Sequence, residues 1–339
     1  MIRIGIIGAG GIGTMHAHCY KSIPEAKVVA IADIIPERAK ELALMFNAEY
    51  LDHGDKIIER QDIDVVDICV PTYLHCEYTL KAASAKKHIL CEKPKALNIE
   101  EGKKMIEATN RAGVKFMVAH VLRYFPEYEN AYNTIKKGLI GLPKLVRTYR
   151  GGPNPAIIRE WYGITEKSGG AIQDMVIHDI DFLKMCFGPV KEVYAKGNVF
   201  KRKNHEDPEY DLIILEFYSG VLAHLVADWS GTEDTPFITK LEIAGTEGLI
   251  DYDSSRSLPL NIRTTVEKGN NESVAIPESP LDPDSNPYTK EIREFLNAVE
   301  NKKEPPISGT EALESLSIAL AALKSIEIDR PVKIEEVLK

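Results

Sequence analysis

The chain has 339 residues, 44% of them hydrophobic and 27% charged, and its formal net charge is −9 at pH 7. This length predicts about two domains, because single hydrophobic cores stop growing beyond roughly 250–300 residues. The acidic balance argues against nucleic acid or an anionic membrane surface as a partner, since both bind basic protein surfaces.

The five cysteines form no C-x-x-C pair and have apolar or helical flanks. They are typical of buried, reduced thiols, so we expect a cytoplasmic protein. The apolar stretch 4–12 is broken by glycines, which predicts a buried strand and a turn rather than a signal peptide. No apolar run approaches the ~18 residues that a bilayer-spanning helix needs.

The first 121 residues alternate short apolar runs with stretches of helical spacing. The apolar runs, which we predict to be strands, are 2–7, 28–32, 65–70, 88–91 and 115–119. The helical stretches between them are 14–22, 36–47, 74–86 and 98–113. Because this alternation is typical of parallel β–α–β units, residues 1–121 are predicted to form an α/β Rossmann domain with a doubly wound parallel sheet.

The pattern changes in residues 122–339. Helices are predicted at 128–139, 174–187, 288–301 and 310–326, and a loop at 277–287. Strands are predicted at 145–150, 190–200, 212–217, 221–229, 240–244 and 249–252. Turn sequences at 218–220 and 245–248 predict antiparallel hairpins. This part of the chain is therefore predicted to be an α+β domain, whose C-terminal helices could pack back on the first domain.

A glycine-rich loop follows the first predicted strand. Gly8, Gly10 and Gly13 form a G-x-G-x-x-G pattern between strand and helix, with Gly11 and Ile12 inside it. Gly8 permits a tight turn, Gly10 a close approach to a pyrophosphate, and Gly13 close packing of the helix on the strand. The amides at the start of the helix would bind the phosphate, so the loop predicts a dinucleotide site.

An acidic residue after the second strand indicates which dinucleotide is bound. Asp33 lies about 20 residues beyond the last glycine, where an acid binds the ribose hydroxyls of NAD. Ile34 and Ile35 follow it, where an NADP site usually has a basic residue for the 2′-phosphate. Arg38 could cover the adenine or simply lie on a solvated helix. NAD is therefore predicted in preference to NADP.

The fourth predicted strand leads into Glu92-Lys93-Pro94. Ligands of open α/β sheets bind at this carboxyl edge, and the proline stiffens the turn. A lysine beside a nicotinamide ring can polarise a substrate oxygen. The alternative is an ordinary surface lysine, and the rigid context favours the functional role.

Two further residues follow strands at the same edge. His75 lies after the third strand, where it could border the cofactor or act as a structural cap. Arg123 lies after the fifth strand, where it could contact cofactor or substrate or pair with a carboxylate.

One predicted helix carries a charged stripe on a largely apolar surface. Asp174, His178 and Asp181 stand at i, i+4 and i+7, which puts them on one face. Because unpaired buried charge is costly, such a stripe must face a cavity or a partner. Histidine is the usual general base near neutral pH, and Asp174 could orient it or hold a substrate hydroxyl. The alternative is a structural His–Asp pair, and the spacing offers too few ligands to predict a metal site.

Together these motifs resemble the glucose–fructose oxidoreductase / inositol dehydrogenase / rhizopine catabolism family of NAD(P)-dependent oxidoreductases, over almost the whole chain. The matching positions are Gly8-x-Gly10-x-x-Gly13, Asp33 with Arg38, Pro71-Thr72-x-x-His75, Glu92-Lys93-Pro94, Arg123, Trp161, Gly169-Gly170 and Asp174-x-x-x-His178-x-x-Asp181. The resemblance implies an open-faced, largely antiparallel sheet in the second domain, used for contacts in a homodimer or homotetramer.

The resemblance also implies roles for individual residues. Those implied to contact the cofactor are Gly8, Gly10, Gly11, Ile12, Gly13, Asp33, Arg38, Pro71, Thr72, His75, Glu92, Lys93 and Arg123. Those implied to contact a sugar or polyol substrate are Lys93, Arg123, Trp161, Asp174 and His178. By this analogy Lys93, Asp174 and His178 are catalytic: His178 takes the hydroxyl proton, and Lys93 holds the reacting oxygen and the nicotinamide ring.

Two departures from the family pattern bear on the substrate and on the helix start. The segment 119–123 lacks the Asn often found two residues before Arg123, which bears on inositol in particular, and Ala171 replaces a common third glycine. A non-catalytic NAD-sensing protein of the same fold is the alternative function. A sensor needs only the phosphate loop and Asp33, so the presence of Lys93, Asp174 and His178 together favours the enzyme.

Overall fold

The computed structural model describes residues 1–199, 209–256, 260–264, 273–274 and 286–338. The chain divides into two compact units, Met1–Tyr124 with Ser279–Glu314 and Phe125–Glu278 with Ser315–Lys339. The predicted loop at 277–287 and the end of the predicted strand at Phe200 fall largely outside the described residues. Within them, no helix combines the length and the apolar character that crossing a membrane requires.

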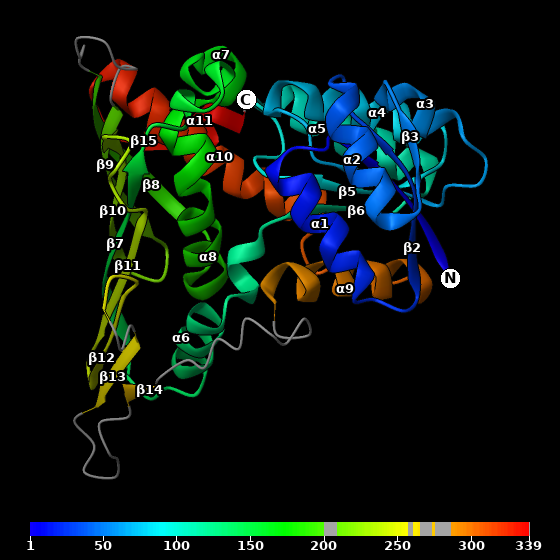
Figure 1. The fold of residues 1–339 in the computed structure, drawn as a ribbon. Helices are drawn as coiled ribbons and strands as arrows, with labels where there is room; N and C mark the ends of the chain where they lie inside the picture. The colour runs from blue at the N-terminus through cyan, green and yellow to red at the C-terminus, as the bar shows by residue number, and fades with distance from the viewer. Residues whose placement is uncertain (200–208, 257–259, 265–272, 275–285, 339) are drawn as a thin grey trace. The chain divides into compact units, whose positions relative to one another are not determined.

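The first unit contains a six-stranded parallel sheet in the order β3-β2-β1-β4-β5-β6. Its strands are β1 (Ile2–Ile7), β2 (Ala26–Ala32), β3 (Glu49–Leu51), β4 (Val65–Ile68), β5 (His88–Glu92) and β6 (Phe116–Ala119). Its helices are α1 (Gly11–Lys21), α2 (Pro36–Phe46), α3 (Gly54–Glu59), α4 (His75–Ser84), α5 (Ile99–Ala112) and α9 (Pro287–Glu300). Helices α4 and α5 cover one face and α1 and α9 the other (Figure 1), which confirms the predicted doubly wound architecture.

Local signals explain where two of these helices begin and end. The Asn98 side chain accepts a hydrogen bond from the Glu101 amide at 2.9 Å and so caps the start of α5. Asn47 adopts a left-handed conformation at the end of α2, which is typical of a C-cap.

Helix α9 explains why residues 279–314 belong to the first unit. Ile292 and Phe295 of α9 are fully buried in the same core as Ile4 and Tyr20. The second domain was predicted to span 122–339, with C-terminal helices that could pack on the first domain. The apolar face of α9 packs in the core of the first unit.

The second unit is built on a nine-stranded sheet in the order β14-β13-β12-β11-β7-β10-β9-β8-β15. Its strands are β7 (Pro143–Pro153), β8 (Val190–Val199), β9 (Glu209–Phe217), β10 (Leu222–Gly231), β11 (Ile238–Gly245), β12 (Gly248–Asp253), β13 (Leu260–Thr264), β14 (Ser273–Val274) and β15 (Val332–Lys333). Both predicted hairpins are confirmed, since β9 pairs with β10 and β11 with β12 in antiparallel fashion. One pair, β7 with β10, is parallel, so the sheet is mixed and mostly antiparallel.

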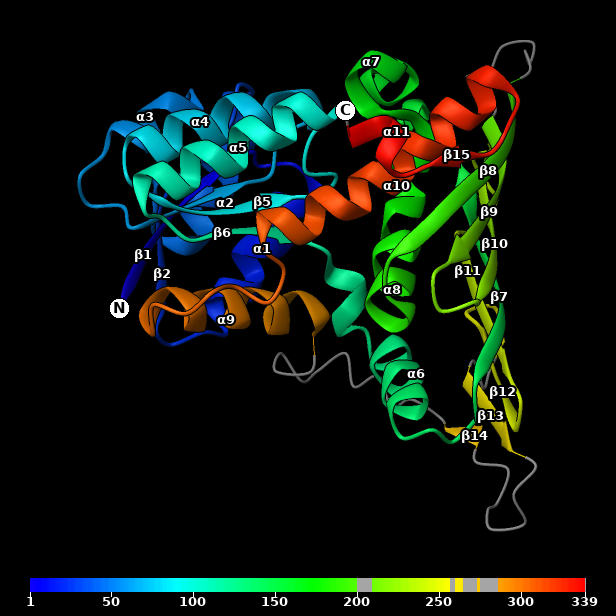
Figure 2. The same cartoon turned by 180° about the vertical axis from the view of Figure 1, so that it is seen from behind.

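Helices cover one face of this sheet. These helices include α6 (Pro126–Lys136) and α8 (Ile177–Phe187), and Figure 2 shows no described element of this unit on the opposite face. The remaining helices are α7 (Thr165–Ser168), α10 (Gly309–Ile328) and α11 (Glu335–Leu338). Side chains of β9 alternate accordingly: Ile213 and Leu215 are fully buried, whereas Leu212 and Ile214 are exposed.

A buried ion pair joins the sheet to α8. The Arg150 guanidinium of β7 donates to both carboxylate oxygens of Asp179, at 2.6 and 3.1 Å, and to the Tyr128 hydroxyl of α6 at 3.2 Å. Arg150 and Asp179 are both buried, so neither charge has water as an alternative partner. The pair therefore fixes how α8 lies on the sheet.

We expect Asp179→Ala to lower the free energy of unfolding by about 3–5 kcal/mol, because it leaves the Arg150 charge buried without its carboxylate. Urea unfolding followed by circular dichroism measures this loss. The double variant Arg150→Met/Asp179→Leu should be more stable than Asp179→Ala, since no buried charge remains. A double variant as unstable as the single one would show that packing, not charge, dominates.

Candidate active site

The predicted cofactor residues of the first unit gather at one edge of the parallel sheet. Gly8, Asp33 and Lys93 follow the carboxyl ends of β1, β2 and β5, and Arg123 lies in the turn after β6. Because neighbouring parallel strands end at the same edge, these residues share it. The strand order reverses between β1 and β4, and dinucleotides bind at such a switch point.

The glycine loop is shaped as a phosphate cradle. Gly8 has φ +104°, and a Cβ atom on it would lie 2.3 Å from the Cys69 carbonyl oxygen. A Cβ on Gly13 would lie 1.9 Å from the Gly8 carbonyl oxygen, whereas one on Gly11 meets nothing within 4 Å. Gly8 and Gly13 are therefore required by close packing, and Gly11 keeps open the space before the first amides of α1. These residues fit the pyrophosphate of a dinucleotide.

Asp33 is held beside this loop. Its carboxylate accepts the Ala9 amide at 2.7 Å and the Ile35 amide at 2.8 Å. Ile34 beside it is 76% exposed, and Arg38 is exposed as well. The carboxylate thus stands at the end of β2, where an acid suits ribose hydroxyls and repels a 2′-phosphate.

His75 links two segments of the sheet edge. It is buried, with Nδ1 2.8 Å from the Pro94 carbonyl oxygen and Nε2 2.9 Å from the Val70 carbonyl oxygen. Burial lowers the pKa of His75. Thr72, in the turn η1 (Thr72–Leu74), is buried too. The structure gives His75 a bridging role, and the predicted cofactor contacts of Pro71, Thr72 and His75 stay predictions.

The two lysines after β5 differ in burial: Lys93 is half-buried and Lys95 is buried. Glu92 is buried and its Oε2 accepts the Lys93 amide at 3.1 Å, while Lys93 is half-buried and is joined to the following Pro94 by a cis peptide bond. Lys95 is buried, and its Nζ donates to the carbonyl oxygens of Gly102 at 2.7 Å and Gly309 at 2.9 Å. Burial lowers the pKa of Lys95 to about 7. The sequence analysis missed this second lysine, because nothing in the pattern separates it from Lys93.

Arg123 pairs with a carboxylate. It lies in the turn η2 (Val121–Tyr124), and both terminal guanidinium nitrogens are 3.4 Å from Glu311 Oε1. Of the three roles that the sequence allowed, the ion pair is therefore present. Contacts with cofactor and substrate stay predictions.

In the second unit, the predicted helix 174–187 begins with a π-helical turn, η5 (Ile172–Val176), which leads into α8. Such π-turns are frequent at functional sites. Between Ala171 and Lys184 every residue is buried except Asp174 and His178, which are half-buried. These two side chains are thus the accessible positions of an otherwise buried segment.

Asp181 does not continue this accessible stripe. It is buried, and its carboxylate accepts the Ser315 hydroxyl at 2.9 Å. The sequence required this stripe to face a cavity or a partner, and Asp181 has a partner because the next turn of α8 packs against α10.

A carboxylate from the sheet holds the start of this segment. Glu209 Oε1 accepts the Ala171 amide at 3.0 Å, and a Cβ on Gly170, which has φ +72°, would lie 2.8 Å from the same oxygen. Burial raises the pKa of Glu209, and burial together with Glu209 raises that of neighbouring Asp211 to about 8. The sequence analysis missed this pair; its signal is two acids on the helix-covered side of β9.

Trp161 lies in an aromatic cluster. It belongs to the turn η4 (Glu160–Gly163) and stacks on Tyr162 with ring centroids 3.9 Å apart. Tyr162 in turn meets the edge of Trp229 at 6.2 Å. The predicted substrate contact of Trp161 would be made by a ring that its neighbours hold in place.

Comparisons with known proteins match both parts of the chain. Residues 2–120 match a family model described as an oxidoreductase family with an NAD-binding Rossmann fold, and residues 128–251 match one described as a GFO/IDH/MocA C-terminal domain. The chain is 34% identical to the uncharacterized oxidoreductase YrbE of Bacillus subtilis, over 100% of this chain and 98% of that protein. It is 32% identical to myo-inositol 2-dehydrogenase of Thermotoga maritima, over 99% of this chain and 100% of that protein. The crystal structure of a probable dehydrogenase from Thermotoga maritima superposes with a TM-score of 0.83 at 30% identity, over 99% of this chain and 100% of that one.

Proposed function

The chain belongs to the Gfo/Idh/MocA family of oxidoreductases, and we propose that it acts on a CH–OH group of a sugar or polyol with NAD as cofactor. The observation that carries the proposal is the pair Asp174 and His178, the accessible positions of the otherwise buried segment 171–184. A buried segment that leaves one acid and one imidazole accessible is suited to acid–base chemistry on a small substrate.

Each part of the chain has a role in this reaction. The loop from Gly8 to Gly13 and the Asp33 carboxylate would hold NAD, which supplies an acceptor for hydride when bound. His178 takes the proton of the substrate hydroxyl as general base, and Asp174 orients the imidazole or holds a second hydroxyl. The Lys93 ammonium donates to the reacting oxygen and stabilises the charge that develops there.

The experiment that tests this function is a substrate panel. Purified protein is offered inositols, aldoses, deoxysugars and sugar acids with NAD or NADP, and reduced nicotinamide is followed by its absorbance. We expect turnover with at least one of these classes and a preference for NAD, because Asp33 repels the 2′-phosphate of NADP. NAD binding without turnover on any compound would instead support the non-catalytic sensor.

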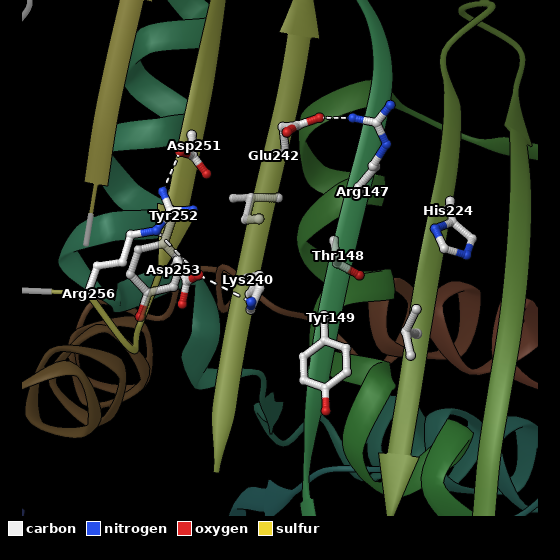
Figure 3. A pocket seen from close by; sticks show the side chains of 12 residues that line it. Arg147, Thr148, Tyr149, His224, Lys240, Glu242, Asp251, Tyr252, Asp253 and Arg256 are labelled. Atoms are coloured by element: carbon white, nitrogen blue, oxygen red, sulfur yellow. Dashed lines mark hydrogen bonds and ion pairs between the residues drawn. The ribbon is translucent and has the colours of Figure 1, made fainter. Parts of the chain in front are cut away.

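We also propose that the bare face of the second unit's sheet binds a second copy of the chain. Leu145 and Leu222, paired across β7 and β10, are exposed there, as are Leu212 and Ile214 of β9. Next to them lies a pocket of about 300 Å³ whose lining carries both signs of charge (Figure 3). Its ion pairs are Arg147 with Glu242, Lys240 with Asp253 and Arg256 with Asp251. A surface with an apolar part and both charges suits self-association about a twofold axis.

Light scattering tests this interface. The wild-type protein should have the mass of a dimer or a larger closed oligomer, and Ile214→Glu with Leu222→Glu should shift it toward the monomer. Leu44→Glu, which changes the 84%-exposed Leu44 of α2, should not. A monomeric wild-type protein would refute the interface.

The cytoplasmic location that we also propose rests on the five cysteines, all of them free thiols in the described chain.

A further inference from the structure

A fully buried histidine lies in α1, one turn after Gly13, the last glycine of the loop. His16 has no exposed surface, and its Nδ1 is 2.9 Å from Asp67 Oδ2 on β4. Its Nε2 is 3.3 Å from Glu92 Oε1 at the end of β5. One ring therefore joins a helix to two neighbouring strands, and neither the cofactor site nor the acid–base chemistry described above uses it.

The geometry around this ring defines its protonation. Nδ1 donates to the Asp67 carboxylate and therefore carries a hydrogen. Nε2 lies 3.3 Å from Glu92 Oε1, an ion-pair contact without the geometry of a hydrogen bond. The Asp67 carboxylate also accepts hydrogen bonds from the Tyr20 hydroxyl at 3.0 Å and from the Cys69 thiol at 3.3 Å. These donors stabilise its negative charge. Burial alone would lower the pKa of His16, but the Asp67 charge raises it well above its usual value. His16 is thus an imidazolium between two carboxylates.

The same groups could be taken for a metal site. His16, Asp67 and Cys69 each offer a ligand atom within 4.8 Å of the others. Burial, however, raises the pKa of the Cys69 thiol, which keeps its proton on sulfur. Hydrogen bonds already account for the close approach of all three side chains, so the cluster needs no ion.

The consequence reaches Lys93 through one residue. Glu92 Oε1 faces His16, and Glu92 Oε2 accepts the amide of Lys93, the next residue in the chain. The ion-pair contact at one oxygen and the hydrogen bond at the other restrain the Glu92 carboxylate, and through it the backbone that carries the Lys93 side chain. We propose that His16 is a positioning residue, which holds Glu92 and thereby sets the place of the Lys93 ammonium. This rests on the proposed function, in which Lys93 contacts the reacting oxygen.

The first test reads the charge of His16 directly in the wild-type protein. Nuclear magnetic resonance of ¹⁵N-histidine-labelled protein should show one doubly protonated ring that does not titrate between about pH 6 and 9. The groups that act on this ring are, by element, Cys19 of α1, Asp67 of β4, Cys69 after it, Glu92 of β5 and Tyr288 of α9. Behind them, the Tyr20 hydroxyl donates to Asp67, and the Glu291 charge acts on Cys19 and Tyr288. A neutral, single-tautomer ring at pH 8 would overturn the proposal.

The second test separates positioning from stability. We expect His16→Gln and Glu92→Gln each to lower kcat by about 10–100-fold, as a misplaced catalytic group does. The KM for substrate and the affinity for NAD should change little, and the double variant should lose no more than the larger single loss. His88→Asn is the matched control, because His88 lies at the other end of β5 and accepts the Lys115 amide at 2.9 Å. It should keep the wild-type kcat.

The outcomes distinguish this inference from the proposed function. If Lys93→Ala is inactive while folded His16→Gln keeps the wild-type kcat, the positioning role is refuted and the function stands. If Lys93→Ala retains full activity, the proposed function itself fails. If His16→Gln does not fold, the charge measured in the wild-type protein and the kcat of Glu92→Gln decide the question.

Discussion

Lys93→Ala should lower kcat by about 10²–10³-fold, the usual cost of removing one donor from a developing negative charge. The ammonium is positioned by a rigid segment, since Glu92 and Pro94 on either side are buried while Lys93 itself is half-buried. NAD affinity should be retained, because the glycine loop and Asp33 are unchanged. Steady-state absorbance gives kcat, and titration calorimetry gives the affinity for NAD.

The matched control is Lys104→Ala. Lys104 is exposed on α5 and pairs with Glu100 at 2.8 Å, so its loss should leave both quantities unchanged. If Lys93→Ala instead weakens NAD binding and saturating NAD restores the wild-type kcat, the lysine only places the cofactor. That result would remove it from the chemical step and leave His178 as the one acid–base group of the proposed mechanism.

The first unit was largely predictable because its signals are local. The glycine loop and the cap at Asn98 act within a few residues, and the longer strands are short, mainly apolar runs. The short elements β3 and α3 were missed, since three to six residues give no periodic pattern. The pairing of β7 with β10 in parallel was missed as well, because hairpin signals describe only neighbours in sequence.

The candidate site also contains some residues that local sequence signals predict and others that only the fold identifies. Lys93, Asp174 and His178 could be singled out by motif and spacing, whereas the different fates of Lys93 and Lys95 depend on the carbonyl groups of Gly102 and Gly309. The helix spacing grouped Asp181 with the accessible residues. Only the fold shows that its carboxylate is taken by a serine 134 positions away in sequence.

His178→Asn should lower kcat by about 10²–10⁴-fold, the range for loss of a positioned general base. The limb of the pH–rate profile set by that base should disappear, and added imidazole should restore part of the activity. Asp181→Asn on the next turn of α8 is the control, since an amide oxygen can still accept the Ser315 hydroxyl, and it should keep both kcat and the profile. The two variants differ in whether the changed side chain is accessible, so equal losses in both would mean that the helix, and not the imidazole, is what the reaction requires. A His178→Asn enzyme with an unchanged pH profile would move the base to another residue, with Asp174 the next accessible group on the same segment.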